Sequence, residues 1–330
     1  MWNSALKGTA GLFLAAILSA PAWGVSDHPG TAYPGTLNYV EGQVSIGSQP
    51  VDSKSIGTAT LGAGETITTQ LGKAEVLLTP GVFLRVGDSS AVKMIAPNIT
   101  DTEVAIQKGE ATVEVTDLHP ENRLIVDEGD AATRLEKKGF YDFAADQGVV
   151  RVFSGQAEVQ ENDRSAKVKG GHAVMLGAQN LKAHGFDKNA YEGDLYNWSK
   201  LRSSYMAEAN ADVAPTYEGY GPGWFGTGWY WDPWLSCYAF VPGGADVFYS
   251  PFGWGFYSPF AFYGGYGAPW GLGYGYGYYG GGFYNRGYYG HGFRGYHGGG
   301  GHGFGGGGFH GGGGGFHGGG GHGGFGGGHR

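Results

Sequence analysis

Three stretches of the chain share one phrase, and this repetition limits the folds that are open to the sequence. They are VEGQVSI at Val40–Ile46, QKGEATVEV at Gln107–Val115 and FSGQAEV at Phe153–Val159. In each, a glycine is followed by Gln or Glu and then by a run in which every second residue is apolar. This period is typical of a strand with one face to a core and the other to water. The glycines are expected at turns, where a positive φ or a close backbone approach excludes other residues.

Further short runs of the same kind separate the three copies. They are expected to be strands and lie at Leu61–Thr69, Ala74–Thr79, Val82–Gly87, Ala91–Met94, Thr102–Ile106, Leu124–Arg134, Gly139–Ala144, Val149–Phe153 and Val168–Leu176. Many short strands at this spacing indicate an all-β fold, either a sandwich, a barrel or a β-helix-like stack of hairpins. One hairpin cannot bury its apolar face alone, so a stack of units explains why the phrase recurs.

The order of these pieces resembles the FecR domain of bacterial envelope proteins. The resemblance is carried by VEGQVSI, LGAGETITT, GKAEVLLTPGVFLRVGDSSAVKM, VVRVFSGQAEV and AKVKGGHAVML, and the domain is assigned to residues 31–186. It implies a β-rich domain outside the cytoplasm that binds partners and catalyses no reaction. FecR regulators carry a cytoplasmic anti-sigma segment and a membrane span before this domain. Here a cleavable leader takes their place, so direct relay to a cytoplasmic sigma factor is not expected.

Residues 1–22 are typical of a secretory signal peptide. Lys7 gives a positive start, Leu12–Leu18 is the centre of a short apolar stretch, and the APA motif that ends at Ala22 matches a cleavage site. The apolar stretch falls short of the ~20 residues that cross a bilayer, and no transmembrane segment is expected in the mature chain. These features predict a periplasmic, secreted or cell-surface location.

After the β domain the sequence predicts one helix over 190–212 and then an aromatic segment, rich in Gly and Pro, over 215–285. Asp194 is the expected helix cap, and Trp198 and Tyr205 belong to an apolar stripe expected to pack on the β domain. Because Gly and Pro interrupt every aromatic run, the segment is not expected to form a regular core. It would be either an irregular cover on the β domain or an exposed surface for carbohydrate, membrane or other chains.

Residues 286–330 are mostly Gly with His, Phe and Tyr, and this tail is expected to be disordered and to self-associate. Its histidines are His291, His297, His302, His310, His317, His322 and His329. A flexible His-rich tract can collect divalent Zn, Ni or Cu weakly, so these seven are candidate metal ligands. No preformed metal site is expected, because their spacing is irregular and a glycine chain holds no ligand in a fixed orientation. No other cofactor is expected.

Charge and motifs narrow the function classes. The formal net charge of −8 falls in the first part of the chain, which argues against nucleic acid as a partner. The sequence contains no HExxH, CxxC, Walker A or nucleophile-elbow motif, so no catalytic residue is assigned. Cys237, the single cysteine, is expected to be an apolar filler. His119 and His172 are expected at the surface, and the acidic residues of DEGD at 127–130 are expected to be solvated charges in a turn.

These features together predict a non-enzymatic exported envelope protein. Its FecR-like β domain would be a binding or scaffold module for envelope proteins or surface polymers, and its tail would self-associate. Two alternatives remain open, namely weak divalent-metal sequestration by the His-rich tail and a FecR-type envelope signalling component.

Overall fold

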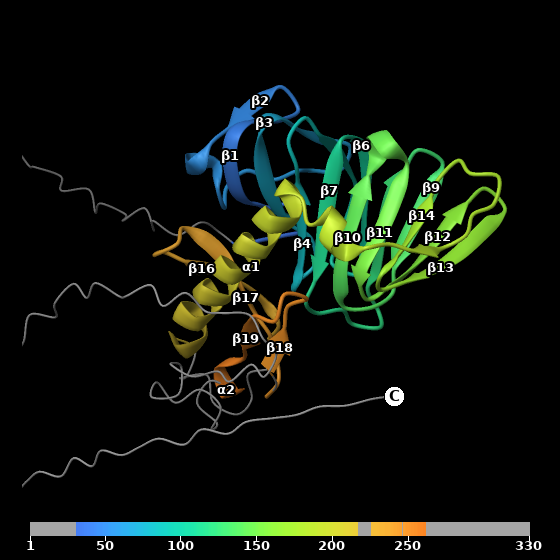
Figure 1. Cartoon of the computed structure of the whole chain (residues 1–330). Coiled ribbons are helices and arrows are strands. Elements are labelled where there is room, and N and C mark those ends of the chain that lie inside the picture. The colour runs from blue at the N-terminus through green and yellow to red at the C-terminus, as the bar shows by residue number, and fades with distance from the viewer. Residues whose placement is uncertain (1–30, 217–225, 246, 262–330) are drawn as a thin grey trace, which may run out of the picture. The chain divides into compact units, whose positions relative to one another are not determined.

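The computed structural model of the chain describes residues 31–216, 226–245 and 247–261 (Figure 1). The predicted signal peptide, the predicted tail with its seven histidines and much of the aromatic segment lie outside the described residues. In the part that is described, no helix is long and apolar enough to cross a membrane.

Strands dominate the described part of the chain. They are β1 (Leu37–Ile46), β2 (Gln49–Val51), β3 (Thr66–Leu77), β4 (Val82–Val86), β5 (Ala91–Pro97), β6 (Asp101–Lys108), β7 (Glu110–Val115), β8 (Arg123–Glu128), β9 (Ala131–Leu135), β10 (Gly139–Ala144), β11 (Val149–Ser154), β12 (Gln156–Glu161), β13 (Arg164–Lys169), β14 (His172–Met175), β15 (His184–Gly185), β16 (Gly228–Asp232), β17 (Cys237–Val241), β18 (Val247–Tyr249) and β19 (Gly255–Tyr257). The α-helices are α1 (Asp194–Val213) and α2 (Pro259–Ala261), and short 3-10 helices lie at Ser53–Ser55, Ala145–Gln147 and Lys188–Tyr191.

Strands β1 to β15 form one fifteen-stranded sheet. Its hydrogen-bonded order is β13-β12-β9-β8-β6-β5-β3-β4-β7-β10-β11-β14-β15, with β1 beside β3 and β2 beside β1. Strand β3 belongs to two arms of this sheet, because Thr66–Thr68 pairs with β5 and Ala74–Leu77 pairs with β4. The sheet therefore changes direction within β3.

The two arms face each other across one hydrophobic core. Residues such as Val92, Val104 and Val126 from one arm and Leu84 and Val113 from the other belong to a single buried cluster. Two layers of a sheet that share one core form a β-sandwich. The all-β prediction is confirmed. Of the three architectures that the sequence left open, the chain adopts the sandwich.

The glycine of each repeated phrase lies where the chain passes from one layer to the other. Gly42 lies within β1, opposite Gly72, at the point where β3 changes arms. Gly109 alone separates β6 from β7, and Gly155 alone separates β11 from β12. In both cases the two strands belong to different arms. The phrase is therefore the sequence signature of a corner between layers.

Both properties expected of these glycines are present. The φ angles of Gly42, Gly109 and Gly155 are +69°, +76° and +93°. A Cβ atom at these positions would lie 2.1 Å from a backbone oxygen, 2.2 Å from Ser90 Oγ and 2.4 Å from the Tyr141 hydroxyl, respectively. No larger residue fits such corners unless the neighbouring strands move apart.

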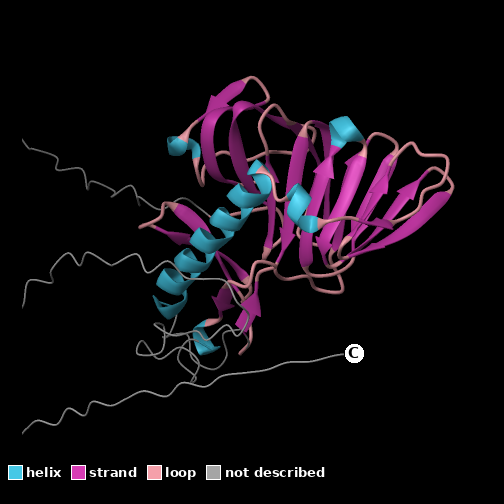
Figure 2. Cartoon of the chain, in the orientation of Figure 1, coloured by secondary structure: helices cyan, strands magenta, loops and turns pink. Residues whose placement is uncertain are grey.

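The prediction that alternate residues face water holds for only part of the sheet. In β12, the strand of the third phrase, Glu158 is half-buried and Gln160 is exposed, as expected. In the second, Thr112 and Glu114 are buried. The expectation fails there because α1 lies across the outer face of β4 and β7 (Figure 2).

Helix α1 spans Asp194–Val213. Its N-cap is Gly193, which makes no side-chain cap, so the prediction that Asp194 caps the helix is wrong. Asp194 Oδ2 instead lies 2.7 Å from Lys73 Nζ of β3, and this ion pair ties the first turn of the helix to the sheet.

The apolar stripe predicted for the helix coincides only in part with its buried face. Trp198 is half-buried against the ring of Tyr39, with 6.1 Å between ring centroids, whereas Tyr205 is exposed. The buried face instead includes Ser199 and Arg202. Polar residues are buried there because the strand face beneath them is itself polar and charged.

The described part of the aromatic segment folds into two hairpins, contrary to the expectation that Gly and Pro would prevent a regular core. Strand β16 pairs with β17, and β18 pairs with β19. Trp229, Phe240 and Phe256 pack with Phe83 of β4 in a second hydrophobic cluster. This part of the segment is therefore a cover on the β domain, although Trp234 at the β16–β17 turn is 85% exposed.

The corners yield a first prediction. Gly109→Ala combines a left-handed backbone with a steric clash, and we expect it to lower the free energy of unfolding by about 2–5 kcal/mol. Gly129→Ala is the matched control, because Gly129 has φ +58° but no atom within 4 Å of the added Cβ. The control should lose only the backbone part, roughly 1–2 kcal/mol. Urea unfolding measures both, and equal losses would contradict the corner interpretation.

Candidate functional site

A cluster of buried charges lies between α1 and the outer face of β3, β4 and β7. Glu75, Arg85 and Glu114 are fully buried. Arg85 Nε lies 2.9 Å from Glu75 Oε2, and its Nη1 lies 2.5 Å from Glu114 Oε2. Arg202 of α1 adds a second guanidinium, with Nη2 at 3.0 Å from Glu75 Oε1. Two carboxylates and two guanidiniums balance one another, and this pairing makes their burial tolerable.

The pKa shifts follow from this pairing. Burial alone would raise the pKa of Glu75, but Arg202 and Arg85 outweigh burial and hold it below its ordinary value. Burial alone would lower the pKa of Arg85, but Glu114 and Glu75 outweigh that effect and raise it. Glu75 and Arg85 are therefore both charged at neutral pH.

Hydroxyl groups of α1 complete this junction. Ser203 Oγ donates to Glu114 Oε1 at 2.8 Å, and the hydroxyl groups of Ser199 and Thr112 lie 2.9 Å apart. The polar side of α1 thus satisfies hydrogen-bonding groups that strand alternation places on the outer face of β7.

Two buried asparagines position the hairpins. Asn38 of β1 accepts from the Tyr238 N–H at 2.7 Å and donates to the Tyr238 carbonyl at 3.2 Å. Asn210 of α1 donates to the carbonyls of Phe240 and Tyr257, at 2.9 and 3.0 Å, and accepts from the Tyr257 N–H at 2.8 Å. Each side-chain amide thus pairs with backbone as a neighbouring strand would. The two residues fix β17 and β19 to the sheet and the helix.

A groove of about 620 Å³ runs beside β16, and we call it the β16 groove. Its lining residues are Thr31, Ala32, Pro34, Pro80, Ile99, Thr227, Gly228, Trp229, Tyr230, Trp231 and Tyr238. None of them carries a formal charge. A cavity of this size with an aromatic lining is in the range of ligand-binding pockets.

The rings of the β16 groove are held in place by cross-strand contacts. Trp231 meets Tyr238 edge to face with 5.2 Å between ring centroids, and Trp229 meets Phe240 at 5.8 Å. Trp229 also packs on Phe83 of β4 at 5.1 Å. The groove therefore has a preformed wall that is tied to the sandwich.

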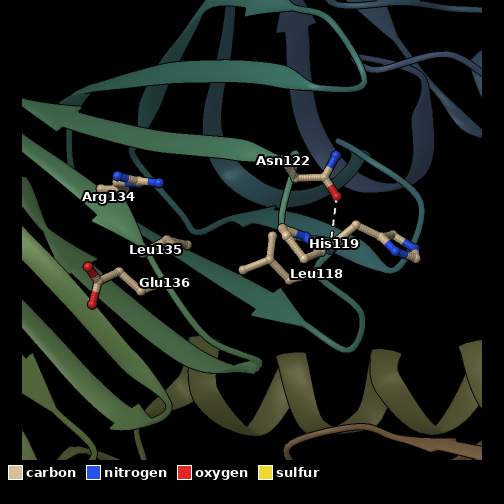
Figure 3. Close-up of a pocket in the computed structure, with 7 residues that line it drawn as sticks. Leu118, His119, Asn122, Arg134, Leu135 and Glu136 are labelled. Carbon is tan, nitrogen blue, oxygen red and sulfur yellow. Dashed lines mark hydrogen bonds between the residues drawn. The ribbon is translucent and has the colours of Figure 1, made fainter.

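A second, polar pocket of about 370 Å³ lies where the β7–β8 loop faces the end of β9 (Figure 3). The His119 N–H donates to Asn122 Oδ1 at 3.0 Å within the loop, and Arg134 and Glu136 line the opposite side. The His119 ring lies 3.2 Å from a carboxylate oxygen of Asp117. Arg134 and Glu136 compensate each other in charge, so this pocket favours no particular charge in a ligand.

Glu128, at the end of β8, is buried, and the prediction of a solvated charge there is wrong. Its side chain lies in the sandwich with neither carboxylate oxygen hydrogen-bonded to any described residue. Burial, helped by Asp142 and opposed by Arg151, raises the pKa of Glu128 to about 8. Its neighbours differ: Asp130 is exposed, and Asp127 is half-buried with a pKa raised by burial to about 6.

The other residues singled out from the sequence are distributed as follows. Cys237 is buried in β17, and burial raises its pKa to about 12, so the thiol is protonated at neutral pH. His119 is half exposed and His172 is exposed. Among the described residues, no group of three or more His, Cys, Asp or Glu side chains is arranged to hold a metal ion. The seven candidate histidines of the tail lie outside that part of the chain.

Sequence reasoning missed Asn38 and Arg85, on which the site depends. Arg85 carried a signal, because it is the one charged residue in the strand VFLRV, whose other side chains are apolar on both faces. A charge in such a strand indicates a buried partner. Asn38 carried none, since nothing local distinguishes it from a surface residue.

Comparison with known proteins assigns no family. No family model matches the chain, and no curated protein matches it. Two crystal structures of a proposed anti-sigma factor from Parabacteroides distasonis ATCC 8503 are similar to parts of it. One has 15% identity and a TM-score of 0.33, over 41% of this chain and 63% of that one. The other has 11% identity and a TM-score of 0.32, over 54% of this chain and 97% of that one. Likeness at this level assigns neither a family nor an activity.

The buried charge cluster yields a second prediction. Arg85→Met would leave Glu75 and Glu114 short of a partner, and we expect a loss of about 3–5 kcal/mol in the free energy of unfolding. Arg123→Met is the control, because Arg123 also contacts two carboxylates but is 47% exposed. Exposed pairs contribute about 0–1 kcal/mol. Urea unfolding of both variants measures the difference, and a loss below ~1 kcal/mol for Arg85→Met would contradict this role.

Glu128 yields a third prediction, on pH. Its pKa is raised from 4.5 to about 8 on folding, so between these values the folded chain binds this proton more tightly than the unfolded chain. Stability therefore falls as pH rises through that window, by up to ~1.4 kcal/mol per pH unit. Glu128→Gln should remove this part of the slope. Glu110, whose pKa is raised to about 7 by burial and Asp142, acts in the same direction but is common to both proteins.

The measurement is urea unfolding of both proteins at about pH 5 and about pH 8. The free energy of unfolding of the wild type, minus that of Glu128→Gln, should be larger at the lower pH. A difference that stays constant across this range would show that Glu128 does not titrate in the folded state as its burial requires.

Proposed function

We propose that the protein is a non-enzymatic binding module of the cell envelope, exported by the leader at residues 1–22 and located in the periplasm or at the cell surface. The resemblance of its β domain to FecR domains supports this proposal, because those domains bind partners and catalyse no reaction. The proposed partners are envelope proteins or surface polymers.

The observation that carries the proposal is the β16 groove. It has a volume of about 620 Å³, an uncharged aromatic lining and walls fixed to a rigid sandwich. The buried charges between α1 and the sheet, Glu75, Arg85 and Arg202, already pair with one another. This division favours a structural role for the charged groups and a binding role for the aromatic ones.

A fourth prediction tests this function. Immobilised residues 23–330 should retain a component of envelope extracts, and replacing Tyr230 and Trp231 by Ser should reduce that retention about tenfold or more, as for aromatic hot spots. Trp234→Ser is the matched control, because Trp234 is 85% exposed on the same hairpin and does not line the groove.

The result has two ways to fail. Equal retention by the groove variant and the control would remove the β16 groove from the proposed function. Chemical change of the retained component over time, lost in the groove variant, would replace the binding module with an enzyme.

A further inference from the structure

Among the described strands, β16 pairs only with β17, so its other backbone edge is unpaired there, and the pairing of β17 shows which residues present that edge. In an antiparallel pair, opposite residues alternate between those that exchange backbone hydrogen bonds and those whose N–H and C=O groups point away from the partner strand. Tyr238 and Phe240 of β17 direct backbone groups to Asn38 and Asn210. These two residues therefore face away from β16.

The pairing register shows which residues of β16 likewise direct their backbone groups away from the partner strand. Trp231 lies opposite Tyr238, and Trp229 lies opposite Phe240. Their backbone N–H and C=O groups consequently point away from β17, toward the free edge of the hairpin. No hydrogen bond joins these backbone groups of Trp229 or Trp231 to any other described residue. The edge thus offers two donors and two acceptors in a row with the spacing of a strand.

The β16 groove runs along β16, because Thr227–Trp231 line it together with Tyr238 of β17. The other lining residues include Pro34, Pro80 and Ile99, which do not pair with β16. An unpaired strand edge beside a cavity is the arrangement that accepts an added strand from another chain. At the other edge of the hairpin, the outward backbone groups of β17 already have hydrogen-bond partners within the molecule, namely the side-chain amides of Asn38 and Asn210.

The chemistry of the groove selects among possible occupants. Its lining carries no formal charge, so a charged ligand would lose hydration without gaining a partner. The rings of Trp231 and Tyr238 already meet edge to face, which leaves less ring surface for stacking on a sugar. Unpaired backbone donors and acceptors are instead the complement of a peptide backbone.

We propose that the β16 groove binds an extended, uncharged segment of a partner polypeptide, which pairs as an added strand with the backbone of Trp229 and Trp231. This inference rests on the proposed function and names its partner class. Affinity comes from the backbone hydrogen bonds, and the aromatic and proline side chains around the edge contact alternate side chains of the segment.

The test uses residues 23–330 and the synthetic hexapeptide acetyl-(Thr-Val)₃-amide, with tryptophan fluorescence as the readout of binding. Two N-methylated forms serve as matched probes, one methylated at the Thr nitrogens and one at the Val nitrogens. An added strand directs only one of these sets of N–H groups at β16. One form should bind like the parent, and the other should bind at least tenfold more weakly. Equal affinity of the two forms, or no saturable binding of the parent at millimolar concentration, would overturn the proposal.

A variant pair tests the protein side of the same bonds. Trp231→Pro removes an N–H from the free edge without removing a bond to β17, since proline is tolerated where a strand faces outward. Trp231→Val keeps that N–H. The proline variant should bind the parent peptide about fivefold more weakly than the valine variant, which corresponds to ~1 kcal/mol for one hydrogen bond. If the two variants bind equally, Trp231 does not pair with the peptide. Should the proline variant fail to fold, the methylated peptides still decide the question.

Other occupants give different outcomes. Binding of the parent peptide only after residues 23–30 are deleted would assign the groove to the chain's own leading segment and overturn the partner. Saturation by chitotetraose in place of the peptide would assign it to carbohydrate and overturn the strand addition. In that last case retention from envelope extracts would persist, so the proposed function would survive the loss of this inference.

Discussion

The junction between α1 and the sheet depends on four charges that are removed from water together. Arg85 is placed by β4 between carboxylates of β3 and β7, and Arg202 reaches the same cluster from the helix. Because both faces of these strands are buried, the strands could not form the sandwich while leaving such charges unpaired. The helix is therefore part of the fold, and the hairpins that follow it are positioned by the same surface.

The sequence predicts what is local in this fold. Three glycines in a repeated phrase indicated turns, which in the structure are corners between layers, and alternating residues indicated the strands. It could not predict which strand faces are covered, because the covering contacts join residues far apart in the chain. Arg202 meets Glu75 across 127 positions, and Asn38 meets Tyr238 across 200. Periodicity also gave the buried face of the helix only in part, since that face includes Ser199 and Arg202, which pack on polar and charged strand residues.

The candidate site shares this non-local origin. The β16 groove is walled by a hairpin near the end of the described chain, the turn at Pro80 and residues that precede β1. The hairpin keeps its place through Asn38 and Asn210 rather than through the sheet hydrogen bonds that hold the sandwich. Aromatic composition indicated a segment that could bind other molecules. The segment forms an ordered wall of the groove, with one unpaired strand edge among the described strands, only because it packs on the outer face of β4.

The corner glycines also determine how the chain alternates between the two layers of the sandwich. At each corner the chain leaves one layer for the other, so both layers are assembled from alternating pieces of sequence, and neither is complete until β13 has been made. Contacts of this kind have large sequence separation, which slows folding. Neither half of the domain could therefore fold as an independent unit. During synthesis from the N-terminus, the sandwich cannot be completed until nearly all of its strands have been made.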